Sequence, residues 1–395
     1  MAKGNRDIND QLYRSRSRSA ADPGLAQSAS RKRKIRSWII LVCVVVLVLL
    51  GVHFVNRFGG TREITSSVLP CYASQNVTPF GNSILYYDGA NIHCLSSTGT
   101  IRWSFPAGDG VSFSVGPSHV AIWRGEQLFI VDSNGNSTYN EALGGTVQFA
   151  RVGSRYAAAV VGEDTESTLY VKDLYGAQVD METEAFSGKM IMDAGFYGDQ
   201  GDYLWTLSLD MFGTAANTIM NTFQVGKMNT GEVSLGSRMI YKVLYENGRL
   251  RVFSTQQMMT FDYKCVQDTN ASRVVYGWKV IGSEVPERGS ARILMAPTTQ
   301  TSSSQTITEL RMLEGDQDRR YTLPGECVGA AVHNGTVYAF SSDYLYRAVP
   351  GSQRFTGYRM PLPEGSRVTA FYGITKDGYA IVAVGDTVYS VSLPQ

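Results

Sequence analysis

Three acidic side chains in one polar stretch of the chain, Asp193, Asp199 and Asp202, have the chemistry of a glycosidase or lyase. Two carboxyl groups held about 5 to 9 Å apart cleave a glycosidic bond, one as general acid and the other as base or nucleophile. The sequence contains no G-x-S-x-G elbow, Walker loop or G-x-G-x-x-G motif. Two functions therefore stay open: an enzyme that uses these acids, and a protein that only binds.

Two short acidic motifs have the pattern of metal sites but fit exposed turns better. The segment Asp132-Ser133-Asn134-Gly135-Asn136 alternates oxygen donors as a calcium loop does. It lacks the distal glutamate of such a loop, and its residue types are those of a tight turn. Asp316-Gln317-Asp318 has the D-x-D form that holds a metal-bound sugar nucleotide in many glycosyltransferases, but Arg319 and Arg320 follow it directly. We interpret both motifs as solvated turns.

The histidines and cysteines form no recognisable ligand set. Neither an H-x-x-x-H nor an H-E-x-x-H motif joins the histidines, which are His53, His93, His119 and His333. There is no C-x-x-C motif, and one cysteine, Cys43, lies in an apolar segment. We expect buried free thiols rather than two disulfides at the others, Cys71, Cys94, Cys265 and Cys327. The sequence thus assigns no catalytic residue, metal or cofactor.

An uncharged segment of eighteen residues, 38–55, predicts a membrane anchor. At about 1.5 Å per residue it reaches about 27 Å, enough for a bilayer core. Its members include Trp38, Ile39, Val45, Leu50 and Val55. No A-x-A cleavage site follows, so we predict an uncleaved signal anchor in the plasma membrane. The basic residues before it should hold the N-terminus in the cytoplasm and leave the rest outside: Arg31, Lys32, Arg33, Lys34 and Arg36.

The segment before the anchor differs sharply in charge from the rest of the chain. Residues 1–37 carry a net charge of +7, whereas the remainder carries −6. A basic, serine-rich segment with few large apolar residues cannot bury enough surface to fold, so we predict a disordered tail. Its Arg-Ser alternation at 14–19 resembles a phosphorylation target or a weak nucleic-acid patch, but we favour contact with anionic lipid heads and expect no nucleic-acid partner. Residues 56–62 are expected to form a short linker.

Beyond the linker, a pair of apolar strands joined by a polar turn recurs about every 42 residues, the length of a four-stranded propeller blade. The turns lie near residues 89, 125, 164, 213, 255, 302, 342 and 385. The last unit has only three strands, at 368–374, 379–384 and 387–393, so a strand at 63–68 is expected to complete it. We predict an all-β, eight-bladed propeller over 63–395, or seven blades if one irregular unit is an insertion. Strand-free breaks are expected at 176–190 and 282–290.

The first unit carries a resemblance to a known repeat. Residues 88–103 look like the quinoprotein-type (PQQ-like) repeat, in which a strand, a turn with glycine and a strand with tryptophan, here Trp103, follow one another. Residues 132–135 match in part, and later units keep the spacing but lose the tryptophan. The arrangement is similar to membrane-anchored propellers of unknown function in clostridial bacteria. Because the carboxylates of the quinone cofactor site have no counterpart, the resemblance implies a binding scaffold, as in the propeller lipoprotein of outer-membrane assembly, rather than a dehydrogenase.

These features favour a non-enzymatic scaffold at the cell envelope that binds another envelope protein or a cell-wall glycan with its loops. The alternative is a carbohydrate-active enzyme with Asp193, Asp199 and Asp202 in the funnel of the propeller. Acids that converge in a concave pocket favour the enzyme, whereas an apolar or aromatic rim favours the scaffold.

Overall fold

The computed structural model describes residues 41–42, 44–48, 63–286, 288–300 and 306–394 of the 395-residue chain. Contacts divide the chain into two units, Met1–Arg62 and Glu63–Gln395. In the first unit, residues 41–42 and 44–48 are helical and exposed. Within the described part of the chain, no helix is both long and apolar enough to cross a membrane.

Most of the predicted topology signals lie outside the described residues. Val45 is described and helical. The tail at 1–37, the linker at 56–62 and most of the 38–55 segment are not described, which includes Arg31, Lys32, Arg33, Lys34, Arg36, Trp38, Ile39, Leu50 and Val55. The anchor and its orientation therefore stay predictions.

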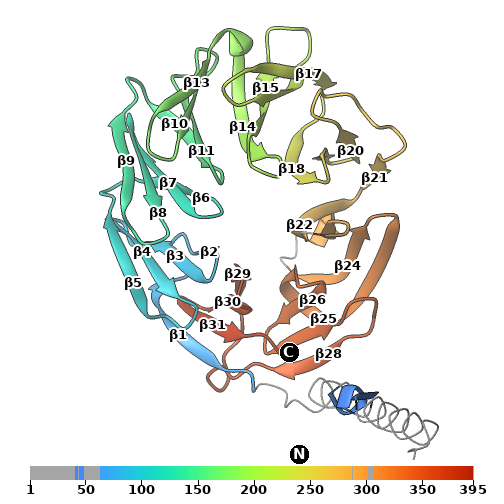
Figure 1. Ribbon diagram of the computed structural model, residues 1–395. Helices are drawn as coiled ribbons and strands as arrows, with labels where there is room; N and C mark the ends of the chain where they lie inside the picture. Colours follow the sequence, from blue (N-terminus) through green and yellow to red (C-terminus); the bar gives the residue numbers. More distant parts are fainter. Residues whose placement is uncertain (1–40, 43, 49–62, 287, 301–305, 395) are drawn as a thin grey trace, which may run out of the picture. The chain divides into compact units, whose positions relative to one another are not determined.

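The second unit consists almost entirely of antiparallel sheets that follow one another around a ring (Figure 1). In the described residues, six of these sheets have four strands each. They are β1 (Ser66–Tyr72) with β29 (Ala370–Ile374), β30 (Tyr379–Val384) and β31 (Thr387–Ser392); β2 (Thr78–Phe80), β3 (Ser83–Tyr87), β4 (Asn91–Ser96) and β5 (Ile101–Pro106); β6 (Ser112–Val115), β7 (His119–Arg124), β8 (Gln127–Asp132) and β9 (Ser137–Ala142); β10 (Val147–Val152), β11 (Tyr156–Val161), β12 (Thr168–Asp173) and β13 (Gln178–Glu182); β14 (Lys189–Tyr197), β15 (Tyr203–Asp210), β16 (Asn217–Gln224) and β17 (Met228–Gly236); and β18 (Ile240–Glu246), β19 (Arg249–Ser254), β20 (Gln257–Phe261) and β21 (Arg273–Val274).

A further sheet has seven strands because one long strand serves two hairpins. Its members are β22 (Trp278–Glu284), β23 (Arg292–Pro297), β24 (Ile307–Glu314), β25 (Gln317–His333), β26 (Thr336–Ser341), β27 (Tyr344–Ala348) and β28 (Thr356–Arg359). Strand β25 pairs with β24 through residues 317–327 and with β26 through residues 327–333. It is thus the outer strand of one group of four and the inner strand of the next.

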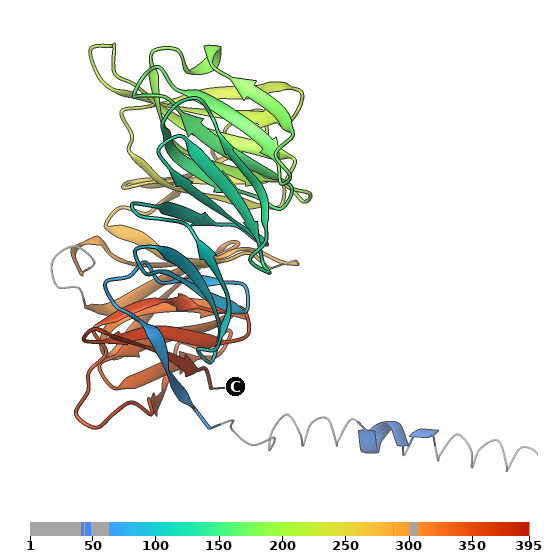
Figure 2. The ribbon, with the colours of Figure 1, turned by 90° about the vertical axis from the view of Figure 1, so that its left-hand side faces the viewer.

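Two distant parts of the unit meet at β1. This strand pairs with β31 and so forms the outer edge of the sheet that contains the C-terminal strands (Figures 1 and 2). Ser66 lies opposite Val391 and Val68 opposite Tyr389, and the backbone N–H of Ser392 donates to the Thr65 carbonyl at 2.9 Å. The observed strand begins at Ser66, and its pairing continues to Tyr72. It therefore overlaps the expected closing strand at 63–68 only at residues 66–68.

Neighbouring sheets pack face to face through apolar clusters. Leu69, Ile381 and Val388 of the sheet with the C-terminal strands pack with Ile84 and Leu95 of the β2–β5 sheet. Since the middle strands are covered on both faces, they are almost continuously apolar, as in residues 120–123 and 157–161, rather than alternating. Burial of both faces is the main force that holds the ring together.

The eight predicted hairpins are all present. They are β3–β4, β7–β8, β11–β12, β15–β16, β19–β20, β23–β24, β26–β27 and β30–β31. The predicted break at 176–190 is wrong, since it contains β13, the short 3-10 helix η1 (Glu184–Phe186) and the start of β14. The predicted break at 282–290 is right only in part, because β22 continues to Glu284 and the described residues of 285–291 hold no strand.

One turn geometry links neighbouring sheets. In the β8–β9 turn, the Asp132 carboxylate accepts hydrogen bonds from two backbone N–H groups of its own turn, each at 2.8 Å. Gly135 in this turn has φ +86°. The indole N–H of Trp103, from β5 of the preceding sheet, donates to the Ser133 carbonyl at 2.9 Å. A Cβ atom at position 135 would lie 2.7 Å from the Trp103 ring, so only glycine allows the ring to pack this closely.

Candidate functional site

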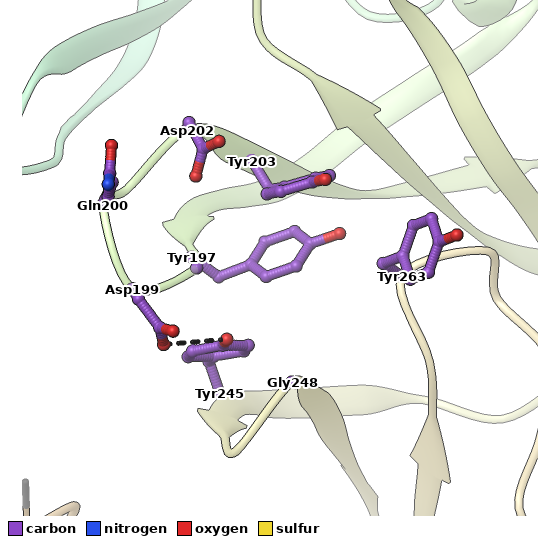
Figure 3. Close-up of a pocket in the computed structure, with 9 residues that line it drawn as sticks. Tyr197, Asp199, Gln200, Asp202, Tyr203, Tyr245, Gly248 and Tyr263 are labelled. Atoms are coloured by element: carbon purple, nitrogen blue, oxygen red, sulfur yellow. Dashed lines mark hydrogen bonds between the residues drawn. The ribbon is translucent and has the colours of Figure 1, made fainter.

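A pocket of about 400 Å³ lies where strand connections from two neighbouring sheets meet (Figure 3). The β14–β15 connection forms one side, with a tyrosine at the end of β14 and another at the start of β15. The β18–β19 hairpin and the turn after β20 form the other side. The lining residues are Tyr197, Gly198, Asp199, Gln200, Asp202, Tyr203, Tyr245, Gly248 and Tyr263.

The four tyrosines form one aromatic cluster. Tyr197 lies in the middle, with its ring centroid 5.3 Å from that of Tyr203 and 5.4 Å from that of Tyr245. Tyr263 lies beyond Tyr203, at 6.2 Å between ring centroids. Tyr197 is 5% exposed, whereas Tyr263 is 43% exposed and lies at the rim. The cluster gives the pocket an aromatic wall with a buried floor.

The polar groups of the pocket are two carboxylates, the Gln200 amide and the tyrosine hydroxyls. The Tyr245 hydroxyl donates to Asp199 Oδ1 at 3.3 Å (Figure 3). Neither Asp199 nor Asp202 forms an ion pair within the described part of the chain. Burial and the charge of Asp199 raise the pKa of Tyr245, and burial raises the pKa of Tyr197. Both phenols are therefore protonated at neutral pH, and the net charge of the pocket comes from the two carboxylates.

The third predicted acid, Asp193, does not reach this pocket. Its Oδ1 accepts hydrogen bonds from Nε and Nη2 of Arg151 on β10, at 3.1 and 2.8 Å. Asp193 lines a different pocket of about 380 Å³ that also contains Met192, Leu209 and Met239, from the other end of the same strands. The expectation that the three acids share one site is wrong: the structure brings Asp199 and Asp202 together and leaves Asp193 in a separate, mostly apolar hollow.

Sequence reasoning missed the four tyrosines. Tyr197 and Tyr203 flank the polar stretch that drew attention to the acids, but Tyr245 and Tyr263 come from the next sheet. No spacing in the sequence joins these two pairs. Only the order of the sheets around the ring brings them together.

A second polar constellation was also missed in the sequence. His93 Nε2 lies 2.7 Å from Asp88 Oδ2, and His93 Nδ1 lies 2.7 Å from Ser104 Oγ, which is the residue set of a serine hydrolase. Ser104 is exposed on the outer strand β5, and neither described pocket is lined by these residues. Asp88 also binds the backbone of its own turn, because Oδ1 accepts the N–H groups of Ala90 and Asn91. We interpret the set as a tie between the β3–β4 turn and strands β4 and β5.

The remaining predicted motifs have structural partners. Asp132 binds its own turn, as described above. Asp316 pairs with Arg273 at 2.9 Å and Asp318 pairs with Arg311 at 2.7 Å, so both acids of the D-x-D motif are engaged with arginines. In the part of the chain that the structure describes, no three His, Cys, Asp or Glu side chains are grouped to hold a metal ion.

The four described cysteines, Cys71, Cys94, Cys265 and Cys327, are free and buried. Burial raises the pKa of the Cys71 and Cys327 thiols to about 12 and that of Cys265 to about 11. A thiol reacts as its thiolate, so these groups are inert at neutral pH.

The ring of antiparallel sheets, with β1 as the outer strand of the sheet that contains the C-terminal strands, is a β-propeller. No family model and no curated protein matches the chain. Among solved structures, the chain is similar to BamB from Moraxella catarrhalis, with TM-score 0.49 and 10% identity, over 85% of this chain and 98% of that one. It is also similar to the Pan2 WD40 domain of Neurospora crassa, with TM-score 0.47 and 8% identity over 84% and 96% of the two chains. A third similar structure is BBS1N in complex with ARL6DN, with TM-score 0.46 and 11% identity over 85% and 97%.

Proposed function

We propose that this protein is a non-enzymatic interaction scaffold, tethered to the plasma membrane, whose propeller lies outside the cell and binds a protein or glycan of the envelope. The tyrosine pocket supports the binding function. It combines four aromatic rings with two carboxylates on one edge of two neighbouring sheets. Tyrosine is enriched among the few residues that carry most of the binding energy at recognition sites, and loops on a rigid scaffold hold such residues in place.

An eight-bladed ring is part of this proposal. The seven-stranded sheet is interpreted as two blades that share β25. One apolar cluster supports this interpretation, because it packs Leu294, Ile307 and Met312 of the first half against Val337 and Ala339 of the second half. Such packing is what separates neighbouring blades elsewhere in the ring. With the six four-stranded sheets, the two halves make eight.

The membrane tether rests on the sequence. The uncharged segment at 38–55 has the length of a bilayer span, and five basic residues between Arg31 and Arg36 precede it. The lipid bilayer is then a first partner, and the tail at 1–37 contacts its cytoplasmic surface. An envelope protein or cell-wall glycan is the second partner.

A carbohydrate-active enzyme is the alternative, and one observation favours it. Asp199 and Asp202 share a pocket with rings of the kind that stack on sugars. Against it, Asp199 is exposed on a loop and accepts a hydrogen bond from Tyr245, whereas a glycosidase acid needs a desolvated carboxyl. The scaffold is therefore the preferred function.

The test is site-specific photo-crosslinking in the cells that make the protein. A crosslinking residue at Gln200, in the pocket, should give a discrete adduct. The matched control is Glu126, an exposed residue in the β7–β8 turn. This turn joins the second and third strands of its sheet, whereas Gln200 lies between the first and second strands of another. Successive turns of an antiparallel sheet lie at opposite ends of the strands, so the two residues lie on opposite faces of the ring. Equal adducts at both positions, or none at Gln200, would contradict binding at the pocket. Purified protein that shortens cell-wall glycans, and loses this activity in Asp202→Asn, would favour the enzyme.

A further inference from the structure

The tyrosine pocket carries a chemical signature that narrows its ligand. We infer that it binds an organic cation, an ammonium or guanidinium group carried on a short alkyl stem. This inference rests on the proposed binding function and names the ligand class of the same site. The charge of the pocket, its rings, its hydrogen-bond acceptors and its size all favour such a ligand.

The first step concerns charge. Asp199 and Asp202 lie on one connection and line one pocket, and neither forms an ion pair within the described residues. A cation bound in the pocket would be attracted to both carboxylates, whereas a neutral ligand would not.

The second step concerns the rings. A tyrosine face attracts a cation that lies within about 6 Å of the ring centroid. This chain already shows the interaction at the rim of the pocket, where Lys264 Nζ lies 5.5 Å from the centroid of Tyr263. Tyr203 and Tyr245 lie on either side of the buried Tyr197, next to Asp202 and Asp199 respectively (Figure 3). Rings combined with carboxylates suit an ammonium or guanidinium group.

The third step concerns acceptors for the N–H groups of such a ligand. An ammonium group has three N–H donors and a guanidinium group has five. The carboxylates of Asp199 and Asp202 line the pocket and supply acceptors for them. Tyr197 supports the other rings from below, because its hydroxyl is buried next to Thr222.

The fourth step concerns size. A volume of about 400 Å³ lies at the lower end of the range for small-molecule sites. It accommodates one lysine or arginine side chain, or a small free amine, rather than a stretch of polymer. These two sources offer the same chemistry, so the experiment separates them.

The experiment is calorimetric titration of the full chain in lipid nanodiscs. Acetyl-lysine-methylamide and its arginine analogue probe a peptide source, and diaminobutane probes a free amine. The neutral controls are the norleucine and citrulline analogues and the trisaccharide of N-acetylglucosamine. We expect the cations to bind, the neutral analogues to bind at least about tenfold more weakly, and the affinity to fall between about 50 and about 500 mM salt.

Matched variants locate the site. Asp199→Asn with Asp202→Asn should weaken cation binding by about tenfold or more. Asp193→Asn, in the other pocket, should leave the affinity unchanged. All variants are checked for an unaltered circular dichroism spectrum.

The outcomes separate this inference from the proposed function. Preference for the amino acid amides indicates a partner's side chain, and preference for diaminobutane indicates a free amine; either supports the cation. Binding of the trisaccharide alone, or cation binding that is unchanged in the Asn variants, overturns the inference. If no probe binds but the Gln200 crosslink forms, the cation is wrong and the scaffold stands. If neither occurs, both fail.

Discussion

At the residue scale, the packing of Trp103 on Gly135 shows how one side chain joins two sheets. Gly135→Ala places a methyl group against the ring and at positive φ, and should lower the free energy of unfolding by about 2 to 4 kcal/mol. Gly125→Ala is the matched control, since φ there is +54° and its Cβ would meet no atom within 4 Å. It should cost about 1 kcal/mol. Urea melts of both variants measure the difference, and equal losses would mean that the tryptophan contact adds nothing.

The lowered pKa of the Asp88 carboxyl group predicts that part of the fold's stability is lost in acid. Hydrogen bonds from the Asn91 backbone and from His93 lower its pKa below the ordinary value of 3.8. A lowered folded-state pKa gives stability that is present above the unfolded value and is lost as the pH falls through the folded value. Asp88→Asn should therefore destabilise the protein at pH 7 and lose less of the remaining stability below about pH 4.

The check on Asp88 is a series of thermal melts between neutral and acidic pH. Asp386→Asn is a suitable control, because this exposed residue accepts a hydrogen bond only through its backbone carbonyl in the described structure. If the melting temperatures of the wild type and of Asp88→Asn fall equally as the pH is lowered, this turn does not contribute to the pH dependence.

The sequence predicted only some of the residues that line the tyrosine pocket. Asp199 and Asp202 were identified because acids in a polar stretch are conspicuous in any sequence. Asp193, only six positions earlier, was grouped with them wrongly, because β14 carries it to the other end of the sheet, where it pairs with Arg151. The tyrosines of the next sheet depend on tertiary structure. Sequence reasoning thus found the charged half of the site and missed its aromatic half.

At the element scale, hairpins were more predictable than outer strands. The middle strands are buried on both faces and read as apolar runs between turns, as in β11 with Tyr156–Val161. The outer strand β13 has the sequence QVDME with no fully buried residue, so its two apolar residues are a weak signal and the sequence predicts a break there. Strand β25 passes from one group of four to the next at Cys327 without a turn, although Pro324-Gly325 just before it is a turn signal. Burial, rather than intrinsic strand preference, carries the readable signal.

The pairing of β1 with β31 makes a prediction about the ends of the unit. A shortened chain that begins at Gly59 should melt cooperatively, whereas one that begins at Cys71 loses most of β1 together with Leu69, which is 2% exposed. The loss exposes the edge of β31 and opens a cavity, and a buried Leu→Ala change alone costs about 2 to 5 kcal/mol. The shorter chain should melt lower or aggregate.

Thermal melts and size-exclusion profiles at equal concentration compare the two shortened chains. Leu69→Ala in the longer chain separates the lost side chain from the lost strand, because it keeps every backbone hydrogen bond. Indistinguishable behaviour of the two chains would show that β1 does not hold the ring closed.

At the scale of the whole molecule, the charges beside the predicted anchor should determine which side of a membrane the propeller occupies. Charge near the anchor decides orientation, since basic residues within about 20 positions of a span resist transfer across the membrane. Replacing Arg31, Lys32, Arg33, Lys34 and Arg36 by glutamine removes five such charges. We expect the wild-type chain to have a protease-sensitive propeller and a protected N-terminal tag in intact cells or spheroplasts, and the neutralised variant to populate both orientations.

The matched control replaces Arg14, Arg16 and Arg18 by glutamine. These three arginines lie at least about 20 positions before Trp38 and so outside the range of the effect. This variant should keep the wild-type orientation, although it changes the charge of the same tail. Orientation is measured as the fraction of an N-terminal and a C-terminal tag that survives external protease, with lysed cells as the reference for full digestion. A C-terminal tag protected in sealed wild-type cells would place the propeller inside. Unchanged orientation in the neutralised variant would show that a feature other than these five charges sets the topology.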